Sequence, residues 1–404
     1  MPISFNSVLI IAGVAVLVPV VLGLLPAVPV PGAVVEVIAG IVIGPSALNW
    51  VRIDAPVQVL SDLGLGMLLF LAGLEIDVAS LRGSLGRLAG TAFAGSAVLG
   101  VGCGFALSAI GPASRPLFLA IVLMSTSAGL LLPLLKDAGQ EHTRFGQLVM
   151  TGAALAEVAT IMMLSLLFSA TSKSTADRVV SLLIFVALLA VFGLALFEVR
   201  RLTGLEQLLD RLEDRSAQLR VRAALTLSLA FGVLAFRFGF ASILGAFAAG
   251  LIVRMIDLTG HAPHPQFEIK LQGIGFGFLI PIFFIATGVQ FDLKALIADP
   301  AAIAEVPLFL AAFLVVRGLP ALLYRRLVGT RHALIAGLMQ ATSLTFVIVA
   351  TQIGLAARLI SPTTSASLLS AGLLSAALFP AAALRLLAAP GQPVPEPAQL
   401  EGTG

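Results

Sequence analysis

Charged residues are scarce in this sequence of 404 residues: 11% are Asp, Glu, Lys or Arg, whereas 59% are hydrophobic. A soluble domain of this length needs more charge to cover its surface, so the composition excludes an ordinary soluble protein. Cysteine is nearly absent too, and the single Cys103 cannot form an intrachain disulfide. The first apolar run lacks a basic start and an A-x-A-type cleavage site, so we expect a retained helix and no signal peptide.

Uncharged apolar runs recur along the whole chain, each with about the 20 residues that a helix needs to cross a membrane. The sequence therefore predicts an all-α integral membrane protein with about thirteen spanning helices. The expected spans are residues 8–25, 31–48, 57–76, 85–110, 115–136, 145–169, 177–199, 219–238, 240–256, 268–290, 303–325, 331–357 and 364–388. The breaks near Phe238 and Ser361 are weakly marked, so a count of twelve stays open. Residues 389–404 are rich in proline and polar residues, which predicts a disordered tail.

Lys and Arg are distributed unequally between the two sides of the expected membrane. With the N-terminus outside, the inner loops hold 16 of the 24 Lys and Arg residues and the outer loops hold 7. Cytoplasmic loops carry the excess of these residues, which predicts an outer N-terminus and a cytosolic C-terminus. The net charge of +3 reflects these loop residues, so no nucleic-acid partner is expected.

The two halves of the chain resemble each other. LAGLEIDVASL (71–81) aligns with ATGVQFDLKAL (286–296) at a shift of 215, and Leu123-Met124 aligns with Leu338-Met339 at the same shift. EVIAGIVIG (36–44) resembles GAFAAGLIV (245–253) at a shift of 210. Each pair is seven helices apart, an odd number, so the second copy must be inverted. The pattern predicts two inverted repeats, helices 1–6 and 8–13, an architecture common among secondary transporters.

Two ionisable residues fall deep inside expected helices. An ionisable side chain at the centre of a bilayer costs at least ~2.5–3.5 kcal/mol, so each one requires a reason. Glu157 lies halfway along helix 6, and Arg317 lies a few residues past the middle of helix 11. Burial favours the protonated form of a carboxyl group and a nearby cation favours the ionised form. A carboxylate balanced between the two can release a proton and bind a metal cation. Arg317 is the expected compensating charge, and it is expected to hold Glu157 or a helix break when no ion is bound.

Helices 5 and 12 are interrupted at mid-depth by small and polar residues, which disfavour an unbroken helix. Hydroxyl groups and unwound carbonyl groups supply the oxygen ligands that Na⁺ or K⁺ requires. The alternative is that these residues only allow close helix packing. The candidate ion-binding residues beside Glu157 are Ser125, Thr126, Ser127, Gln340, Thr342 and Ser343.

The sequence resembles the transmembrane domain of Kef-type and bacterial Na⁺/H⁺ exchangers, a family of monovalent cation:proton antiporters. The resemblance covers nearly the whole chain and rests on VPVPGAVVEVIAGIVIGPSAL, LGLGMLLFLAGLEIDV, MSTSAGLLLPLLKDAG, GAFAAGLIV and FLIPIFFIATGVQFDL. It implies a domain over residues 1–388 with a mobile core (helices 4–6 and 11–13), a scaffold that dimerises (helices 1–3 and 8–10) and a linker, helix 7. It also implies that helices 5 and 12 cross at their breaks, and a homodimer in the bacterial inner membrane.

By position, Glu157 matches the family's ion-binding acid and Arg317 matches the basic residue on the facing helix. The sequence departs from the family pattern at Ala156, where Asp, Asn or Gln is usual, and at Glu157, where Asp is usual. Because Ala156 binds no proton and a guanidinium hardly ever deprotonates, the expected exchange is one cation for one proton. Glu36 resembles a family residue and is expected to line an aqueous funnel or the scaffold.

Several other features are expected to have no direct role in transport. Glu75, Asp77, Asp292 and Lys294 fall at helix ends, where solvated interface positions account for them. No cofactor and no resident metal centre are expected; the expected partners are Na⁺ or K⁺, protons and the lipid bilayer. A Na⁺-coupled symporter of organic anions is an alternative of similar architecture. An intramembrane hydrolase or sensor is a third, although no motif such as H-E-x-x-H lies within a helix, and we expect no enzyme.

Overall fold

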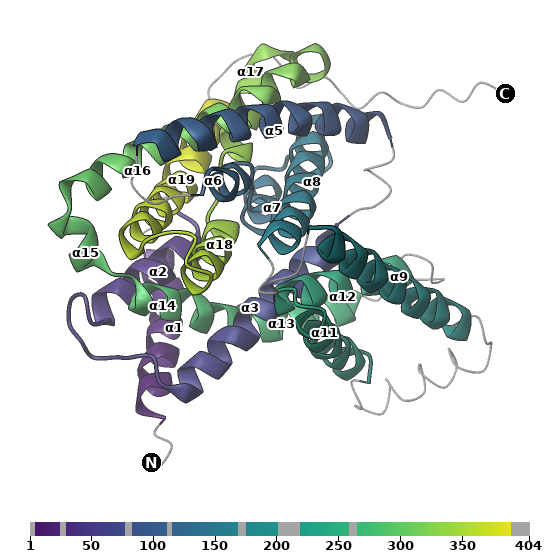
Figure 1. Ribbon diagram of the computed structural model, residues 1–404, viewed down its shortest axis with the longest axis horizontal. Coiled ribbons are helices and arrows are strands. Elements are labelled where there is room, and N and C mark those ends of the chain that lie inside the picture. The colour runs from purple at the N-terminus through teal and green to yellow at the C-terminus, as the bar shows by residue number, and fades with distance from the viewer. Residues whose placement is uncertain are drawn as a thin grey trace.

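The computed structural model describes residues 5–24, 30–76, 83–110, 115–168, 175–200, 219–257 and 265–388. Within these ranges the regular structure is helical and contains no strand (Figure 1). The predicted all-α fold is therefore confirmed. The predicted tail, residues 389–404, and Asp77 lie outside the described residues.

The helices of the first half are α1 (Asn6–Leu24), α2 (Gly32–Ile43), α3 (Ala55–Glu75), α5 (Ser84–Ile110), α6 (Pro116–Leu123), α7 (Ala128–Asp137) and α8 (Arg144–Leu167). Helix α9 (Thr175–Arg200) follows. The second half begins with α11 (Leu219–Arg237), α12 (Ser242–Asp257), α13 (Pro265–Ile274), a π-helical turn η1 (Gly275–Leu279), α14 (Ile280–Gln290) and α15 (Leu293–Ala298). It ends with α16 (Pro300–Phe313), a second π-helical turn η2 (Leu314–Gly318), the 3₁₀ helix η3 (Pro320–Tyr324), α17 (Arg325–Gln340), α18 (Thr345–Ala356) and α19 (Pro362–Ala388).

Nine of the described helical stretches are long and apolar enough to cross a membrane, judged by length and composition. Three shorter apolar helices, over Gly32–Ile43, Val180–Leu194 and Ser242–Met255, fall in further predicted spans. The longest stretch, Pro300–Ala356, is interrupted inside α17, where Gly329 has non-helical backbone angles. The chain is a multi-pass membrane protein, and the number of thirteen spans stays a prediction.

The two weakly marked breaks near Phe238 and Ser361 are both helix ends in the structure. After α11, Gly239 adopts a left-handed φ of 86°, and after α18, Arg358 adopts a φ of 54°. A left-handed residue just past the last turn lets the following N–H groups bond back to the free carbonyl groups, which stops a helix. The chain therefore turns at each point, and α11 and α12 are separate helices, as are α18 and α19.

Four glycines confirm the inverted repeats. Gly40 of α2 packs against Gly288 of α14, and Gly250 of α12 packs against Gly73 of α3. The two contacts are equivalent, because Gly250 follows Gly40 by 210 positions and Gly288 follows Gly73 by 215. A Cβ atom at any of the four would meet a backbone carbonyl group of the facing helix. Small residues are required where helix backbones approach this closely. The contact of α2 with α14 and the contact of α12 with α3 are therefore two copies of one close helix crossing.

The remaining contacts divide the helices into two groups. Helices α5, α6, α8 and α16–α19 pack mainly against one another, with α7 against α8, whereas α3 packs on α12 and α14, α2 on α14, and α11 on α12. Helix α9 contacts α8 of the first group and α12 of the second. The main contacts between the groups are α2 with α19, α3 with α7 and α8 with α12. The expected division into a mobile core, a scaffold and a linker helix stays a prediction.

Both predicted helix breaks are present. The first separates α6 from α7, and the second separates α17 from α18. The breaks do not follow the predicted shift of 215: α6 ends at Leu123 and α17 ends at Gln340, which are 217 positions apart. The match between Leu123-Met124 and Leu338-Met339 is thus two residues out of register. In the first repeat, the segment compared runs from the end of α3 to the end of α6. In the second repeat, the equivalent segment runs from the end of α14 to the end of α17 and is two residues longer.

Candidate ion-binding site

Ser127 joins the two helix breaks. It precedes α7, and its backbone N–H bonds to the carbonyl oxygen of Thr342 at 3.0 Å. Its hydroxyl oxygen accepts hydrogen bonds from the N–H groups of Leu344 and Thr345, at 2.9 and 3.0 Å. These N–H groups begin α18 and have no partner within that helix. Ser127 therefore caps a helix in the opposite repeat, and the predicted crossing of the two breaks is present.

The other predicted polar residues gather at the same crossing. Thr126 Oγ1 donates to the carbonyl oxygen of Gln340 at 2.6 Å. The hydroxyl groups of Ser125 and Ser343 are hydrogen-bonded to each other, and the backbone N–H of Ser343 donates to Ser375 Oγ at 3.1 Å. These side chains satisfy backbone groups that a break would otherwise leave unpaired inside the protein.

Arg317, from η2, is 1% exposed and donates hydrogen bonds to residues at and around this crossing. Its Nε donates to Thr126 Oγ1 at 2.8 Å, and its Nη1 donates to Ser96 Oγ at 3.2 Å. Its Nη2 donates to the carbonyl oxygen of Gly152 at 3.1 Å and to Gln340 Oε1 at 3.2 Å. One guanidinium thus links α5, α8 and both breaks. Its fork of rigidly placed donors suits several acceptors at once.

Two aromatic residues, Tyr324 and Phe93, lie next to this hydrogen-bond network. Gln340 Nε2 donates to the hydroxyl group of Tyr324 at 3.0 Å, and the guanidinium carbon of Arg317 lies 5.8 Å from the centre of the Phe93 ring. Among the described residues, no ion pair joins Arg317 to Glu157. Of the two expected partners of Arg317, Glu157 or a helix break, its hydrogen bonds go to the breaks, and its role as a compensating charge stays a prediction.

Glu157 is 3% exposed and lies on α8 beside the first break. The backbone N–H of Ala128, the first residue of α7, is the backbone donor that acts electrostatically on its carboxylate. The N-terminus of a helix carries a partial positive charge, so the half-helix α7 presents its positive end to Glu157. The second carboxylate oxygen, Oε2, is buried and has no hydrogen-bond partner in the described structure. A ligand could occupy that free position.

A cavity of about 530 Å³ reaches Glu157. Its walls come from α2 and α3 on one side and from α7 and α8 on the other, with η1, α14, α18 and α19 contributing. Four carboxylate residues line it: Glu36, Glu75, Asp137 and Glu157. Neither lysine nor arginine is among the described lining residues. The remaining lining is mostly apolar. The arrangement gives a cation, or a proton donor such as water, a path to the free oxygen of Glu157.

A second cavity of about 260 Å³ lies at the opposite end of the helices. It is lined by the end of α14, the end of α18 and the start of α19, and includes Gln290, Asp292 and Gln352. Helix α19 contributes Pro362 to this cavity and Leu384 to the first. Twenty-two residues of α-helix span ~33 Å, about the thickness of the hydrocarbon layer. The second cavity does not include Glu157 among its lining residues.

The sequence matches a known protein family. The family described as sodium/hydrogen exchanger, transmembrane, matches residues 10–387. The chain belongs to the sodium/hydrogen exchanger family. The family is a transporter family, and its members are multi-pass membrane proteins.

Individual relatives agree with this assignment. The Bacillus subtilis protein YjbQ, named as a Na⁺/H⁺ antiporter, is 29% identical over 383 residues, which make up 91% of this chain and 60% of YjbQ. The Na⁺/H⁺-K⁺ antiporter GerN of Bacillus cereus is 26% identical over 261 residues, 64% of this chain and 65% of GerN. This exchanger thus spans less than two thirds of the length of both relatives. The solved structure of the sodium proton antiporter MjNhaP1 from Methanocaldococcus jannaschii shares the fold, with a TM-score of 0.60 at 15% identity, covering 93% of this chain and 96% of that chain.

Sequence reasoning missed several residues of this exchanger's site. Ser96, Gly152, Tyr324 and Ser375 all bond to the crossing, and no spacing or motif marks them. Glu75 was expected at a solvated helix end, yet it lines the first cavity and its Oε2 is buried. Its alignment with Gln290 in the repeats was the available signal. Glu36 also lines the first cavity, and its role in an aqueous funnel stays a prediction.

Proposed function

We propose that this chain exchanges Na⁺ for protons across a membrane, with both ions competing for Glu157. The observation that carries the proposal is the free Oε2 of Glu157, which is buried and lies at the wall of a cavity lined by carboxylates. A buried carboxylate is costly to ionise without a partner. Two states relieve that cost: a proton on the carboxylate, or a bound cation.

The exchange chemistry follows from these two states. A proton that leaves Glu157 departs through the cavity, and the ionised carboxylate then binds Na⁺ with the N–H of Ala128 still acting on it. When Na⁺ leaves, a proton returns to the same oxygen. Obligate exchange requires the empty ionised carboxylate to stay where it is, and burial without a partner opposes its movement through the protein. Only loaded forms would carry the site from one side of the membrane to the other.

The lining of the cavity disfavours the symporter alternative. An organic anion would have to enter past three carboxylates, Glu36, Glu75 and Asp137, before it reached a fourth, with neither lysine nor arginine among the described lining residues. Like charges in a confined space repel strongly because the walls have a low dielectric constant. The same field attracts a small cation, which favours antiport.

The cation, the stoichiometry and the assembly belong to this proposal as well. The names of YjbQ and GerN support Na⁺, and that of GerN makes K⁺ a second cation to test. We assign one proton per cation, because Ala156 precedes Glu157 and is buried without a titratable group. The core and scaffold of the family, a homodimer and a bacterial cell membrane with the C-terminus in the cytosol complete the assignment. In that orientation the first cavity opens to the cytosol.

The test is exchange by the purified chain in liposomes that contain a pH-sensitive dye and carry an imposed proton gradient. Na⁺, K⁺ and Li⁺ are added in turn, and we expect Na⁺ to dissipate the gradient. Glu157→Gln should abolish the response. Glu305→Gln is the matched control, because Glu305 lies in α16 and is among the lining residues of neither cavity. An active Glu157→Gln protein would overturn the site, and a wild-type chain that responds to no alkali cation would overturn the function.

A further inference from the structure

Glu75 and Gln290 are equivalent residues of the two repeats. Glu75 ends α3 and Gln290 ends α14, 215 positions apart. The residues that follow have nearly identical backbone angles: φ −70° and ψ 119° at Ile76, and φ −69° and ψ 122° at Phe291. Each following residue also donates its N–H to an equivalent glycine carbonyl, on Gly73 or Gly288. The equivalence therefore rests on structure as well as on sequence.

The two residues line different cavities at opposite ends of the protein. Glu75 lines the first cavity together with Glu157, and Gln290 lines the second. The operation that superimposes the repeats exchanges the two ends, so one access route has a carboxylate where the other has an amide. Asp292 also lines the second cavity, but its carboxylate accepts the N–H of Ala295 at 2.9 Å and caps α15.

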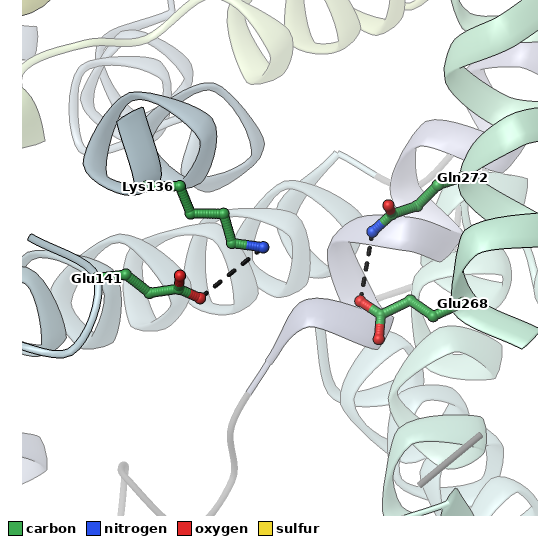
Figure 2. A network of polar contacts seen from close by, with 4 residues as sticks. All are labelled: Lys136, Glu141, Glu268 and Gln272. Carbon is green, nitrogen blue, oxygen red and sulfur yellow. Dashed lines mark hydrogen bonds and ion pairs between the residues drawn. The ribbon is translucent and has the colours of Figure 1, made fainter. Parts of the chain in front are cut away.

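One carboxylate oxygen of Glu75 has no partner among the described residues. Its Oε2 is buried without a hydrogen bond, and Nε of Arg254 nearby is likewise without one in the described structure. Lys136 is within electrostatic range of Glu75 but pairs with Glu141 at 3.8 Å, as Figure 2 shows. The carboxylate of Glu268 accepts a hydrogen bond from Gln272 at 3.3 Å in the same view (Figure 2). Oε2 of Glu75, a cavity-lining residue, thus makes no hydrogen bond in the described structure, and the carboxylate lies within electrostatic range of Lys136, Arg254 and Glu157.

We propose that Glu75 is a cation-recruiting residue that makes the apparent affinity for Na⁺ higher on the side of the first cavity than on the opposite side. This inference rests on the proposed exchange at Glu157. A carboxylate in a cleft with low-dielectric walls raises the local concentration of cations, and the amide of Gln290 cannot do so. Detailed balance limits the effect: the two apparent KM values differ, while the ion gradients at which exchange reverses stay the same.

Sided membrane vesicles provide the experiment. Na⁺-driven proton movement is measured in right-side-out and everted vesicles from cells that lack other exchangers, and the KM for Na⁺ is obtained for each side. We expect the wild-type KM to be about three- to tenfold lower on the side of the first cavity. Glu75→Gln should raise the KM on that side by the same factor and leave the other side unchanged, whereas Glu75→Asp should retain most of the difference.

Three further variants separate recruitment from general surface charge. Gln290→Glu should lower the KM on the second side only, and Glu75→Gln combined with Gln290→Glu should invert the asymmetry. Glu268→Gln removes a nearby carboxylate that is not a lining residue of the cavity and should change neither KM by more than about twofold. Equal KM values on the two sides of the wild type, or an equal effect of Glu75→Gln and Glu268→Gln, would overturn the inference. In either case Glu157→Gln still reports on the proposed function separately.

Discussion

The two buried charged residues of this protein, Arg317 and Glu157, have opposite surroundings. Arg317 is 1% exposed, makes four hydrogen bonds and lines neither cavity. Glu157 is 3% exposed, keeps one oxygen without a partner and lines a cavity. A buried ionisable group whose nitrogen atoms are all hydrogen-bonded tends to stay in one state. A group with a vacant position can change its partner, so the comparison favours our proposal that Arg317 serves stability and Glu157 serves transport.

The largest expected effect is the loss of exchange in Glu157→Gln with the fold retained. The amide fills the same space and keeps an oxygen on which the N–H of Ala128 can act, but it has no charge to exchange a proton for a cation. We expect exchange to fall by at least about 100-fold while thermal unfolding of the detergent-solubilised protein is unchanged or occurs at a higher temperature, because a buried charge is removed. A marked fall in unfolding temperature would mean that Glu157 also holds the structure.

Arg317→Ala should show the reverse pattern, with stability lost first. The substitution leaves acceptors on Thr126, Ser96, Gly152 and Gln340 without their donor. Breaking a buried charged network from one side costs about 3–5 kcal/mol, and we expect a large fall in the unfolding temperature. Arg325→Ala, at an exposed position of α17, is the matched control, with an expected change within about 0.5 kcal/mol. A normally stable Arg317→Ala protein without exchange would move Arg317 into the transport site.

Competition at one carboxylate also fixes the dependence of the KM for Na⁺ on pH. Where Glu157 is mostly protonated, each fall of one pH unit should raise the apparent KM about tenfold, because one proton must leave before one cation binds. At higher pH the KM should level off. A plot of log KM against pH with a limiting slope of −1 supports a single titrating group. A slope near −2 would require a second proton carrier in the site.

Ser127→Ala should have a smaller effect that is confined to the crossing. The hydroxyl of Ser127 accepts the first N–H groups of α18, and loss of a helix cap costs about 1–2 kcal/mol. Ser108→Ala, on the exposed part of α5, controls for the substitution itself. We expect the two variants to differ in unfolding temperature by a few degrees. Equal stability of Ser127→Ala and Ser108→Ala would show that water replaces the cap.

The sequence predicted the parts of this fold that have a periodic or depth signal. Apolar runs located the helices, and Glu157 and Arg317 stood out because charges are rare at mid-membrane. The clustering of Ser125, Ser127 and Thr342 also followed from the interrupted runs. The sequence could not decide which partner Arg317 bonds to, because both the carboxylate of Glu157 and the two helix breaks offer acceptors to a buried cation. The choice depends on side-chain geometry, which no spacing along the chain encodes.

The smallest expected effect is that of Glu36→Gln on stoichiometry. Glu36 lies on the cavity wall with Glu157, so it is a candidate for a second proton carrier if the core and scaffold close on each other. Its helix α2 belongs to the group packed through Gly40 on α14, whereas α8 belongs to the other group. If the proposed core moves against the proposed scaffold, a carboxylate on α2 does not travel with a site on α8, so we expect Glu36 to influence access and not the number of protons carried.

Voltage decides the point, because each elementary charge moved costs ~2.3 kcal/mol per 100 mV. In liposomes held at zero and at about −100 mV, wild-type exchange should reverse at the same ion gradients, which indicates one proton per cation. Glu36→Gln should reverse at those same gradients and lower the rate by less than about twofold. If wild-type reversal moves with voltage and the shift disappears in Glu36→Gln, Glu36 carries the second proton. If the shift persists in that variant, the second carrier is another of the cavity carboxylates. The Glu75→Gln variant, already made for its effect on KM, then shows whether Glu75 is that carrier.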